Sequence, residues 1–502
     1  MRTGINVASN WGIYSANVVV AFFLSPYMVR MLGDSPFGAW NILVSLTGYM
    51  GLVDLGTRSA VVKYAAEYYA KKEYDTLATV FYSSFISVAI GGTVLLLGAL
   101  AVRGHVASWL AVSGTLGELF TAAIFPSALA IVLSIAGGII LGHIAGVGRY
   151  DLSNLVSAIS LAVRTGGIVF FLERGGSLPE LAWVLVVTAA LSCPLAFVVL
   201  NRLVPSLRLK AGVFDTGRWR QVIGYGFFAF LNQVAARISR ESDNIIVGAA
   251  VSTTATAYYA IGINLASYLK TFISSAAVVA IPLTSGMEAR QDAEGQWRVT
   301  VLGTRFALCV ALCGTVGFFL LGRDFLTLWL GERFAVNTWP TGFVLFIALV
   351  FAASQQFAGA MLFGRGKAKF PALMMVTSAV VNLVLSILLV RKMGVLGVAL
   401  GTLISAAILE FGFISLYYTP KVLESSRVAY VRQTWVGPLV CLVPSLVAGW
   451  LVRSLVDVSG YAELLGVGAV VLAGYFVPAW WVCLNSEERA SALARVKGRT
   501  ER

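Results

Sequence analysis

A short stretch of the chain places charged residues inside an otherwise apolar run. Residues 232–244 read NQVAARISRESDN. The residues that would share one helix face, at spacings of three and four, are Arg237, Arg240, Glu241 and Asn244. Guanidinium groups on such a face could hold a phosphate by charge-assisted hydrogen bonds. The same charges could instead neutralise one another as ion pairs, since Asp243 lies three residues from Arg240.

Of the other basic residues within or at the ends of apolar runs, the candidates are Arg30, Arg58, Arg164 and Lys270. For Arg58, the enrichment of Lys and Arg at the cytoplasmic ends of membrane helices is a sufficient explanation. Arg164 and Lys270 lie too deep for that, and each is as well placed to line a cavity as to pack. Because positive charge between low-dielectric walls attracts anions, these residues predict a site for a pyrophosphate.

Acidic and uncharged polar residues complete the set of candidates. Glu241, Asp243 and Glu410 are candidates for coupling transport to protons or sodium ions, although structural ion pairing explains their spacing equally well. The candidates for contacting sugar hydroxyls are Tyr14, Asn17, Tyr49, Asn232 and Tyr268. Aromatic residues in membrane helices also serve as packing or as interface belts, so both interpretations stay open.

Composition decides what kind of elements must position these residues. Of the 502 residues, 58% are apolar and 12% are charged, and the mean hydropathy is +0.83. A soluble chain has about 45–50% apolar and about 25% charged residues. The composition therefore excludes a soluble globule, a disordered chain and a coiled coil, and it predicts an all-α polytopic membrane protein.

Residues that support metal or nucleophilic chemistry are scarce. The chain has two histidines and five cysteines, and all five cysteines lie in apolar stretches. An odd number of buried thiols disfavours a disulfide framework, and two histidines leave little for a zinc site or a histidine base. We expect no cofactor and no metal. The net charge of +13 lies in short loops that offer no groove for nucleic acid, so we expect no nucleic-acid partner.

Fourteen apolar stretches are long enough to cross a bilayer core about 30 Å thick. They are residues 7–31, 38–60, 76–102, 119–146, 152–172, 181–200, 221–251, 256–283, 299–321, 340–363, 370–390, 395–418, 435–451 and 464–484. With the N-terminus inside, the inside segments carry 24 of the 37 Lys and Arg residues and the outside segments carry 8. Because cytoplasmic loops are enriched in these residues, we expect both termini in the cytoplasm.

Two parts of the chain resemble each other at offsets between 215 and 219. The matching residues are Trp40 with Tyr259, Tyr49 with Tyr268, Lys71 with Arg290, Glu73 with Asp292, Gly146 with Gly364, Gly148 with Gly366, Arg149 with Lys367, Asn17 with Asn232 and Gly33 with Gly248. Each pair falls at an equivalent helix or loop. A repeat of six helices enters the membrane twice from the same side, which predicts two lobes related by an axis along the membrane normal.

The repeat divides the chain as follows. We expect an N-terminal lobe of six helices over residues 1–203, a cytoplasmic linker over 204–220 and a second six-helix lobe over 221–420. Two further helices would occupy residues 421–486, and a basic cytoplasmic tail would occupy 487–502. This arrangement is typical of a transporter.

Two stretches of this sequence resemble a known family. The stretch from Ser25 to Tyr68 is similar to the opening of Wzx-type polysaccharide-repeat flippases, which belong to the multidrug/oligosaccharidyl-lipid/polysaccharide exporter superfamily. It reads SPYMVRMLGDSPFGAWNILVSLTGYMGLVDLGTRSAVVKYAAEY. ISRESDNIIVG, from Ile238 to Gly248, is similar to their seventh helix. The likeness in pattern extends over all fourteen expected helices, although the motifs are loose. Lipid II flippases belong to the same superfamily, and in their first helix a proline is followed by an asparagine. Here Pro26 is followed by Tyr27, which weighs against a lipid II substrate.

The resemblance implies a function that the residues alone do not. It implies a translocase of the bacterial inner membrane that carries undecaprenyl-pyrophosphate-linked oligosaccharides for O-antigen, lipopolysaccharide or exopolysaccharide assembly. It also implies alternation between inward-open and outward-open states, with basic cavity residues on the pyrophosphate. The expected partners are this lipid-linked oligosaccharide, membrane lipids and the polysaccharide polymerase machinery.

Two other classes of membrane protein share part of this sequence pattern. A cation-coupled multidrug exporter of the same superfamily usually has twelve helices and an acidic site, whereas this chain offers a basic one and two more helices. A membrane enzyme that polymerises or ligates oligosaccharides should expose a large external loop. The longest outside segment expected here, residues 322–339, is predicted to be a solvated connection, so we expect a transporter and not an enzyme.

Overall fold

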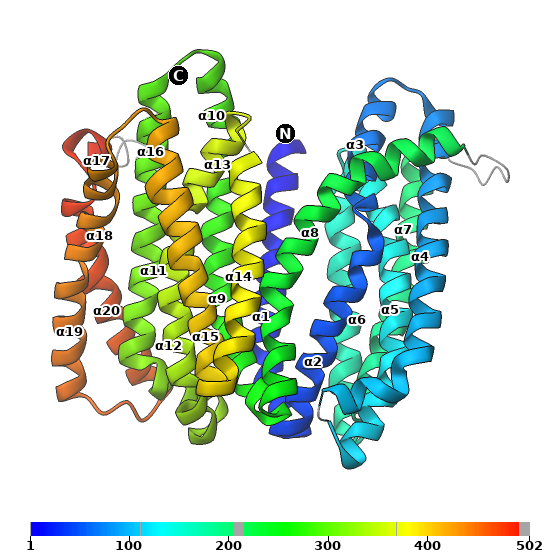
Figure 1. The fold of residues 1–502 in the computed structure, drawn as a ribbon, viewed down its shortest axis with the longest axis horizontal. Helices are drawn as coiled ribbons and strands as arrows, with labels where there is room; N and C mark the ends of the chain where they lie inside the picture. The colour runs from blue at the N-terminus through cyan, green and yellow to red at the C-terminus, as the bar shows by residue number, and fades with distance from the viewer. Residues whose placement is uncertain (1, 111, 205–214, 368, 491–502) are drawn as a thin grey trace. The chain divides into compact units, whose positions relative to one another are not determined.

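The computed structural model describes residues 2–110, 112–204, 215–367 and 369–490, and all regular elements in these ranges are helical (Figure 1). The chain divides into two compact units, Met1–Ala257 and Tyr258–Arg502. The elements of the first unit are α1 (Arg2–Leu32), α2 (Asp34–Met50), the 3₁₀ turn η1 (Gly51–Asp54), α3 (Thr57–Ala70), α4 (Tyr74–Trp109), α5 (Gly114–Gly146), α6 (Tyr150–Glu173), α7 (Leu178–Leu203) and α8 (Thr216–Ala250).

The second unit continues the helical pattern. Its elements are α9 (Thr253–Val278, which begins in the first unit), α10 (Ala280–Ala289), α11 (Ala293–Leu330), α12 (Glu332–Ser354), α13 (Gln356–Gly364), α14 (Lys369–Met393), α15 (Val395–Ser405), the π-helix η2 (Ala406–Tyr418), α16 (Thr419–Val422), α17 (Arg427–Val431), the π-helix η3 (Arg432–Val436), α18 (Gly437–Val440), α19 (Leu442–Leu455) and α20 (Tyr461–Val482). Most of the expected tail lies outside the described residues.

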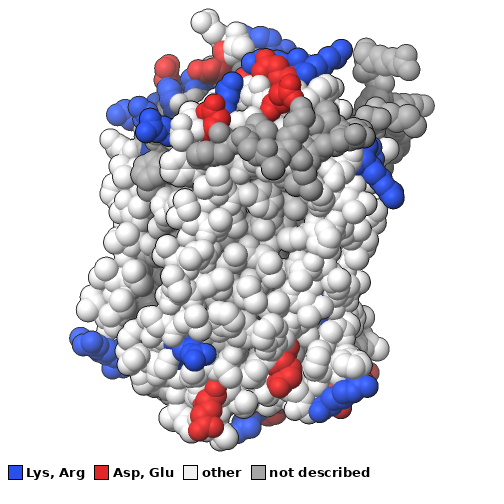
Figure 2. Space-filling view, turned by 90° about the vertical axis from the view of Figure 1, so that its right-hand side faces the viewer, with Lys and Arg blue, Asp and Glu red and all other residues white. Residues whose placement is uncertain are grey.

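Membrane-spanning helices are confirmed as the main structural feature. Among the described residues, twelve helical segments are long and apolar enough to cross a bilayer. The other two expected spans are also helical, but α2 to α3 is interrupted and α8 carries many charges. Figure 2 shows one face of the molecule with charged side chains at two ends and an uncharged band between them. Such a band fits the hydrocarbon layer.

Two expected segments differ from the structure. The span expected over 38–60 is broken, because Leu55 and Gly56 adopt positive φ values of 50° and 73° and end one helix before the next begins. The solvated connection expected over 322–339 is wrong, since α11 continues to Leu330 and α12 begins at Glu332. Gly331 makes the sharp turn between them at a φ of 95°, which a residue with a Cβ rarely adopts.

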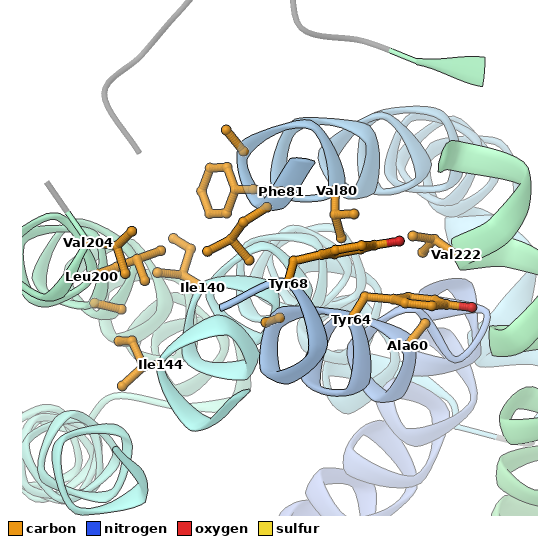
Figure 3. Close-up of a cluster of buried hydrophobic side chains, with 14 of the residues drawn as sticks. Ala60, Tyr64, Tyr68, Val80, Phe81, Ile140, Ile144, Leu200, Val204 and Val222 are labelled. Atoms are coloured by element: carbon orange, nitrogen blue, oxygen red, sulfur yellow. The ribbon is translucent and has the colours of Figure 1, made fainter. Parts of the chain in front are cut away.

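A hydrophobic core holds α3, α4, α5 and α7 together in the first unit (Figure 3). Phe81 of α4 and Ile144 of α5 are almost fully buried, and Tyr64 and Tyr68 stack with ring centroids 6.2 Å apart. In a membrane, where lipid tails are as apolar as leucine, close van der Waals packing of this kind holds helices together.

The same local geometry occurs once in each unit at the offset found in the sequence. Helix α3 packs on α5, and α10 packs on α13. A Cβ at Gly146 would lie 2.8 Å from the carbonyl oxygen of Val62, and a Cβ at Gly364 would lie 2.7 Å from that of Ile281. Following these glycines, Gly148 and Gly366 take φ values of 82° and 71°. Each crossing therefore depends on a glycine that lets two backbones approach.

Arg305 is one of the residues that fasten the C-terminal helices to α11. Arg305 donates from Nη1 to the carbonyl oxygen of Cys483 at 2.8 Å and from Nε to that of Gln433, and Glu488 lies 3.7 Å from its Nη1. These bonds join α11 to the segment around η3 and to the end of α20. The bond to Cys483 satisfies a backbone carbonyl group at the end of α20, where helical hydrogen-bond partners run out.

Replacing Arg305 by alanine is expected to lower the free energy of unfolding by about 2 kcal/mol, because hydrogen bonds from a charged donor are lost. Thermal unfolding of the purified protein in detergent measures this. The control is Arg298→Ala, which breaks only the exposed pair with Glu294 at 3.6 Å and is expected to change stability by less than about 0.5 kcal/mol. Equal effects of the two substitutions would contradict the fastening role.

Candidate functional site

Polar side chains of α2 and α8 meet within the first unit. We call this the α2–α8 seam and define it as Ser45, Gly48, Tyr49, Arg237, Glu241, Ser242 and Asn244. The two helices pack directly against each other (Figure 1). Small residues at spacings of three on α2 let its backbone approach α8 closely, so the polar side chains of α8 have room to lie between the helices.

An ion pair occupies the middle of the seam. Arg237 Nη1 lies 3.3 Å from Glu241 Oε1, one helical turn away, and the two side chains are 32% and 17% exposed. Two glycines make room for this pair, because a Cβ at Gly48 would lie 2.9 Å from Glu241 Cδ and a Cβ at Gly51 would lie 3.6 Å from Arg237 Nη2. One N–H group of the guanidinium is engaged, and the planar fork has further donors.

Hydrogen bonds across the helices continue the seam beyond the ion pair. Asn244 donates from Nδ2 to Ser45 Oγ at 3.1 Å, and the hydroxyl groups of Tyr49 and Ser242 bond to each other. The side-chain amide oxygen of Asn244, Oδ1, is buried and accepts no hydrogen bond from the described residues. Buried amide oxygens nearly always have a partner, so this oxygen is an acceptor that a ligand could use.

The turn η1, which follows α2, contributes Asp54, and neighbouring polar groups hold its carboxylate. Asp54 accepts a hydrogen bond from the backbone N–H of Arg58 at 3.3 Å and another from the side chain of Gln233 on α8. The Arg58 side chain itself is exposed. Asp54 thus fixes the start of α3 against α8 by hydrogen bonds.

The structure brings some of the predicted residues together and leaves others apart. Of the first unit, Tyr49, Arg237 and Glu241 meet in the seam, and Asp243 is buried beside it at 2% exposure. Arg240 is exposed, so it does not share the buried face expected for it. Arg30 is exposed at the end of α1. Half-buried Arg164 on α6 forms no ion pair with any described residue.

The remaining candidates contribute little to the seam. Tyr14 packs edge-on against Trp11, with ring centroids 6.3 Å apart, and Asn17 donates to the carbonyl oxygen of Ile13 in its own helix. The side chain of Asn232 lies outside the described residues. In the second unit, Lys270 is exposed on α9, Tyr268 is half-buried on the same helix, and Glu410 is half-buried on the π-helix η2.

The sequence interpretation missed three seam residues: Ser45, Gly48 and Ser242. A signal was present on α2, because Gly48 and Tyr49 lie three and four residues after Ser45 and so share its side of the helix. Among the residues that the structure describes, no group of three His, Cys, Asp or Glu side chains could hold a metal ion. The chemistry that the seam offers is therefore hydrogen bonding and charge.

These features define a class: an all-α, multi-pass membrane protein with an arginine-containing polar seam between its helices. The family described as "Polysaccharide biosynthesis protein" matches residues 4–288, more than half of the chain. The chain belongs to this family. The resemblance to Wzx-type polysaccharide flippases noted in the sequence is thereby confirmed.

Individual relatives agree with this assignment. The chain is 21% identical to the uncharacterized membrane protein EpsK of Bacillus subtilis, over 99% of this chain and 98% of the relative. It is 22% identical to a putative O-antigen transporter of Shigella flexneri, over 78% and 92% of the two chains. Its fold is similar to that of the lipid II flippase MurJ in an inward closed conformation, with a TM-score of 0.69, 13% identity and coverage of 98% and 99%.

Proposed function

We propose that this protein is a translocase that moves undecaprenyl-pyrophosphate-linked oligosaccharide units across the bacterial inner membrane by alternating access. The product would supply O-antigen or exopolysaccharide assembly. The observation that carries the proposal is the half-buried Arg237, held between α2 and α8 in a member of a polysaccharide biosynthesis family. A relative named as an O-antigen transporter and a fold like that of a lipid II flippase support it.

The need for a polar seam follows from solvation. Moving an ionised head group with many hydroxyl groups through hydrocarbon costs tens of kcal/mol by ideal estimates, so the protein must supply a polar path. Arg237 would hold the phosphates, and the other basic candidates for this role are Arg30, Arg58, Arg164, Arg240 and Lys270. Tyr49 and the free amide oxygen of Asn244 would hydrogen-bond the sugar, while the polyprenyl tail stays in lipid.

The transport cycle would use the duplicated architecture. We propose fourteen spans arranged as two six-helix lobes plus two C-terminal helices, with both termini in the cytoplasm. The recurrence of the Gly146 crossing at Gly364 and of the following turn supports the duplication. Rocking of one lobe against the other would expose the head group on alternate sides of the membrane.

Two further parts of the proposal concern coupling and partners. Glu241, Asp243 and Glu410 are the acids that could exchange protons or sodium ions during the cycle. Because the exported unit must be joined into a polymer, the polysaccharide polymerase machinery would act next on the same lipid-linked product. Neither role asks the protein itself to make or break a glycosidic bond.

Deleting the gene tests the function. We expect a lipid-linked oligosaccharide to accumulate on the cytoplasmic leaflet, with surface polysaccharide lost and restored by the wild-type gene. Lys270→Ala in the restored strain should abolish export while the protein remains inserted, whereas the exposed Arg298→Ala should export normally. A deletion strain that keeps its surface polysaccharide and becomes sensitive to cationic drugs would contradict the proposal and favour a multidrug exporter.

Gly48→Ala is expected to reduce export several-fold with a loss of stability of about 1 kcal/mol. The new methyl group would lie 2.9 Å from the Glu241 side chain and push it away from its place beside Arg237. Export and thermal unfolding are measured on the same variant. Gly98→Ala on α4, where nothing lies within 4 Å of the added Cβ, is the control. Wild-type export by the Gly48 variant would show that the space beside Gly48, which the Glu241 side chain occupies, is not needed.

A further inference from the structure

Helix α8 is long enough to reach both ends of the first unit. It has 35 residues, which at 1.5 Å per residue extend over about 50 Å, more than the hydrocarbon thickness of about 30 Å. Its first turns and its last turns must therefore lie toward opposite membrane surfaces. Each end can be fastened to its neighbours independently.

At its N-terminal end, α8 is tied to α3 and α4. Arg218 donates from Nη1 to the hydroxyl of Tyr68 at 2.8 Å and lies over the same ring, 5.2 Å from its centroid. Trp219 donates from Nε1 to Ser87 Oγ at 3.0 Å. Figure 3 shows the Tyr68 ring extending from the core of α3 toward Val222 of α8. The hydroxyl of an otherwise buried tyrosine is thus used to hold this end of α8.

At its C-terminal end, α8 is packed on α2. A Cβ at Gly248 would lie 2.3 Å from Ile42 Cδ1, so the isoleucine occupies the space that the glycine leaves. Val247 and Ile42 are both fully buried. Between this contact and the tie at Arg218 lies the α2–α8 seam, so α8 contacts the same unit along most of its length.

Contacts at both ends restrict what α8 can do in a rocking cycle. When two bodies rock, contacts between them close at one membrane surface and open at the other. A helix that is fastened to the same neighbours at both surfaces can leave them only by breaking both sets of contacts. The sequence repeat assigns α8 to the second lobe, as the counterpart of α1, whereas its contacts assign it to the first unit.

We infer that α8 moves with the first unit throughout transport, and that Arg218 and Trp219 are positioning residues that keep Arg237 against α2. The inference rests on the proposed function. The seam then stays assembled in both access states, and its contribution to holding the pyrophosphate, through Arg237, comes from one moving body. The boundary between the moving bodies then falls after α8 and not at the linker before it, so the body that rocks against the first lobe in the proposed cycle is the second lobe without α8.

Crosslinking tests this directly. In a chain whose five native cysteines are replaced, one pair of cysteines is placed at Ser87 and Trp219 and another at Ile42 and Gly248. A short bifunctional maleimide joins each pair in the membrane, and export is measured before and after. Single-cysteine chains treated with the same reagent are the controls. We expect each crosslinked chain to keep at least about half of the export of its untreated form, because a helix that never separates is not hindered by a tether.

The opposite results would overturn the inference. If α8 moves with the second lobe, one of the two crosslinks must trap a single access state and stop export while the single-cysteine controls remain active. Failure of both pairs to crosslink would show that the contacts do not persist. If the cysteine-free parent chain, in which Ser87, Trp219, Ile42 and Gly248 are unchanged, exports nothing, the proposed function fails instead, and the crosslinking yields still report whether both ends of α8 stay in place.

Tyr68→Phe separates a positioning role of the Arg218–Tyr68 hydrogen bond from a purely structural one, because only a positioning role should change KM for translocation. It removes the acceptor of Arg218 and keeps the ring. In proteoliposomes with an undecaprenyl-pyrophosphate-linked oligosaccharide as the probe, we expect KM for translocation to rise about three- to tenfold at an unchanged maximal rate. A lower maximal rate at unchanged KM would mean that the tie only stabilises the fold and would contradict the positioning role.

Discussion

Replacing Arg237 by alanine is expected to abolish glycan export while the protein still inserts in the membrane. The guanidinium is the one basic group of the seam, and it lies where a phosphate could reach its remaining N–H donors. A charge-assisted contact of this kind is stronger than a neutral hydrogen bond, and no neighbouring lysine or arginine of the seam can replace it. Surface polysaccharide is the measurement, with membrane content of the protein determined in the same cells.

Removing Arg237 also leaves Glu241 without its ion-pair partner, so loss of folding must be separated from loss of binding. The alanine variant is expected to lose about 1–3 kcal/mol of stability, because a carboxylate that is only 17% exposed becomes unpaired. The double variant Arg237→Ala/Glu241→Gln removes the unpaired charge and should regain most of this stability. We expect export to stay lost in the double variant. Recovery of export there would contradict a direct role of the guanidinium.

The positions of the spans could be predicted because hydropathy over twenty residues is a strong signal, whereas the interruptions could not. Gly51 and Gly56 are tolerated inside many membrane helices, and nothing in the sequence shows that Leu55 takes a left-handed conformation. The outcome depends on the packing of η1 against its neighbours. Likewise Gly331 looked like one residue of a loop, although it makes the whole turn between α11 and α12.

Helical periodicity predicted part of the seam and could not supply its partners. Arg237 and Glu241 were expected on one face at a spacing of four residues, and the structure pairs them. Their neighbours on α2 are about two hundred residues away in the chain, and a single serine such as Ser45 gives no hydropathy signal. Arg240 was expected on the same face, but the structure leaves its side chain exposed, because the side of α8 that packs on α2 does not extend to it.

The packing partner of α8 was the least predictable feature. The match of Asn17 with Asn232 predicts that α8 corresponds to α1 in a sequence repeat, and it carries no information about which unit α8 contacts. The contacts that decide this come from Tyr68 and Ser87, whose hydroxyl groups are distant in sequence from Arg218 and Trp219. The spacing of the predicted repeat therefore does not determine which neighbours a helix packs against.

Adding a methyl group at either of the two crossing glycines is expected to destabilise the protein strongly. At Gly146 the new Cβ would lie 2.7 Å from the Cβ of Ala65 and 2.8 Å from the carbonyl oxygen of Val62. At Gly364 it would lie 2.1 Å from Thr284 Oγ1 and 2.7 Å from the carbonyl oxygen of Ile281. Because a backbone oxygen cannot rotate away, the helices must separate, at a cost of about 1–3 kcal/mol or more.

Thermal unfolding of the purified variants measures this loss, and Gly166→Ala on α6 is the matched control. Nothing lies within 4 Å of a Cβ at Gly166, and alanine favours a helix over glycine by about 1 kcal/mol, so this variant should be at least as stable as the wild type. If the two crossings are built alike, Gly146→Ala and Gly364→Ala should lower the unfolding temperature by similar amounts. A neutral Gly364→Ala beside a damaging Gly146→Ala would mean that the second copy has relaxed the contact that its sequence still repeats.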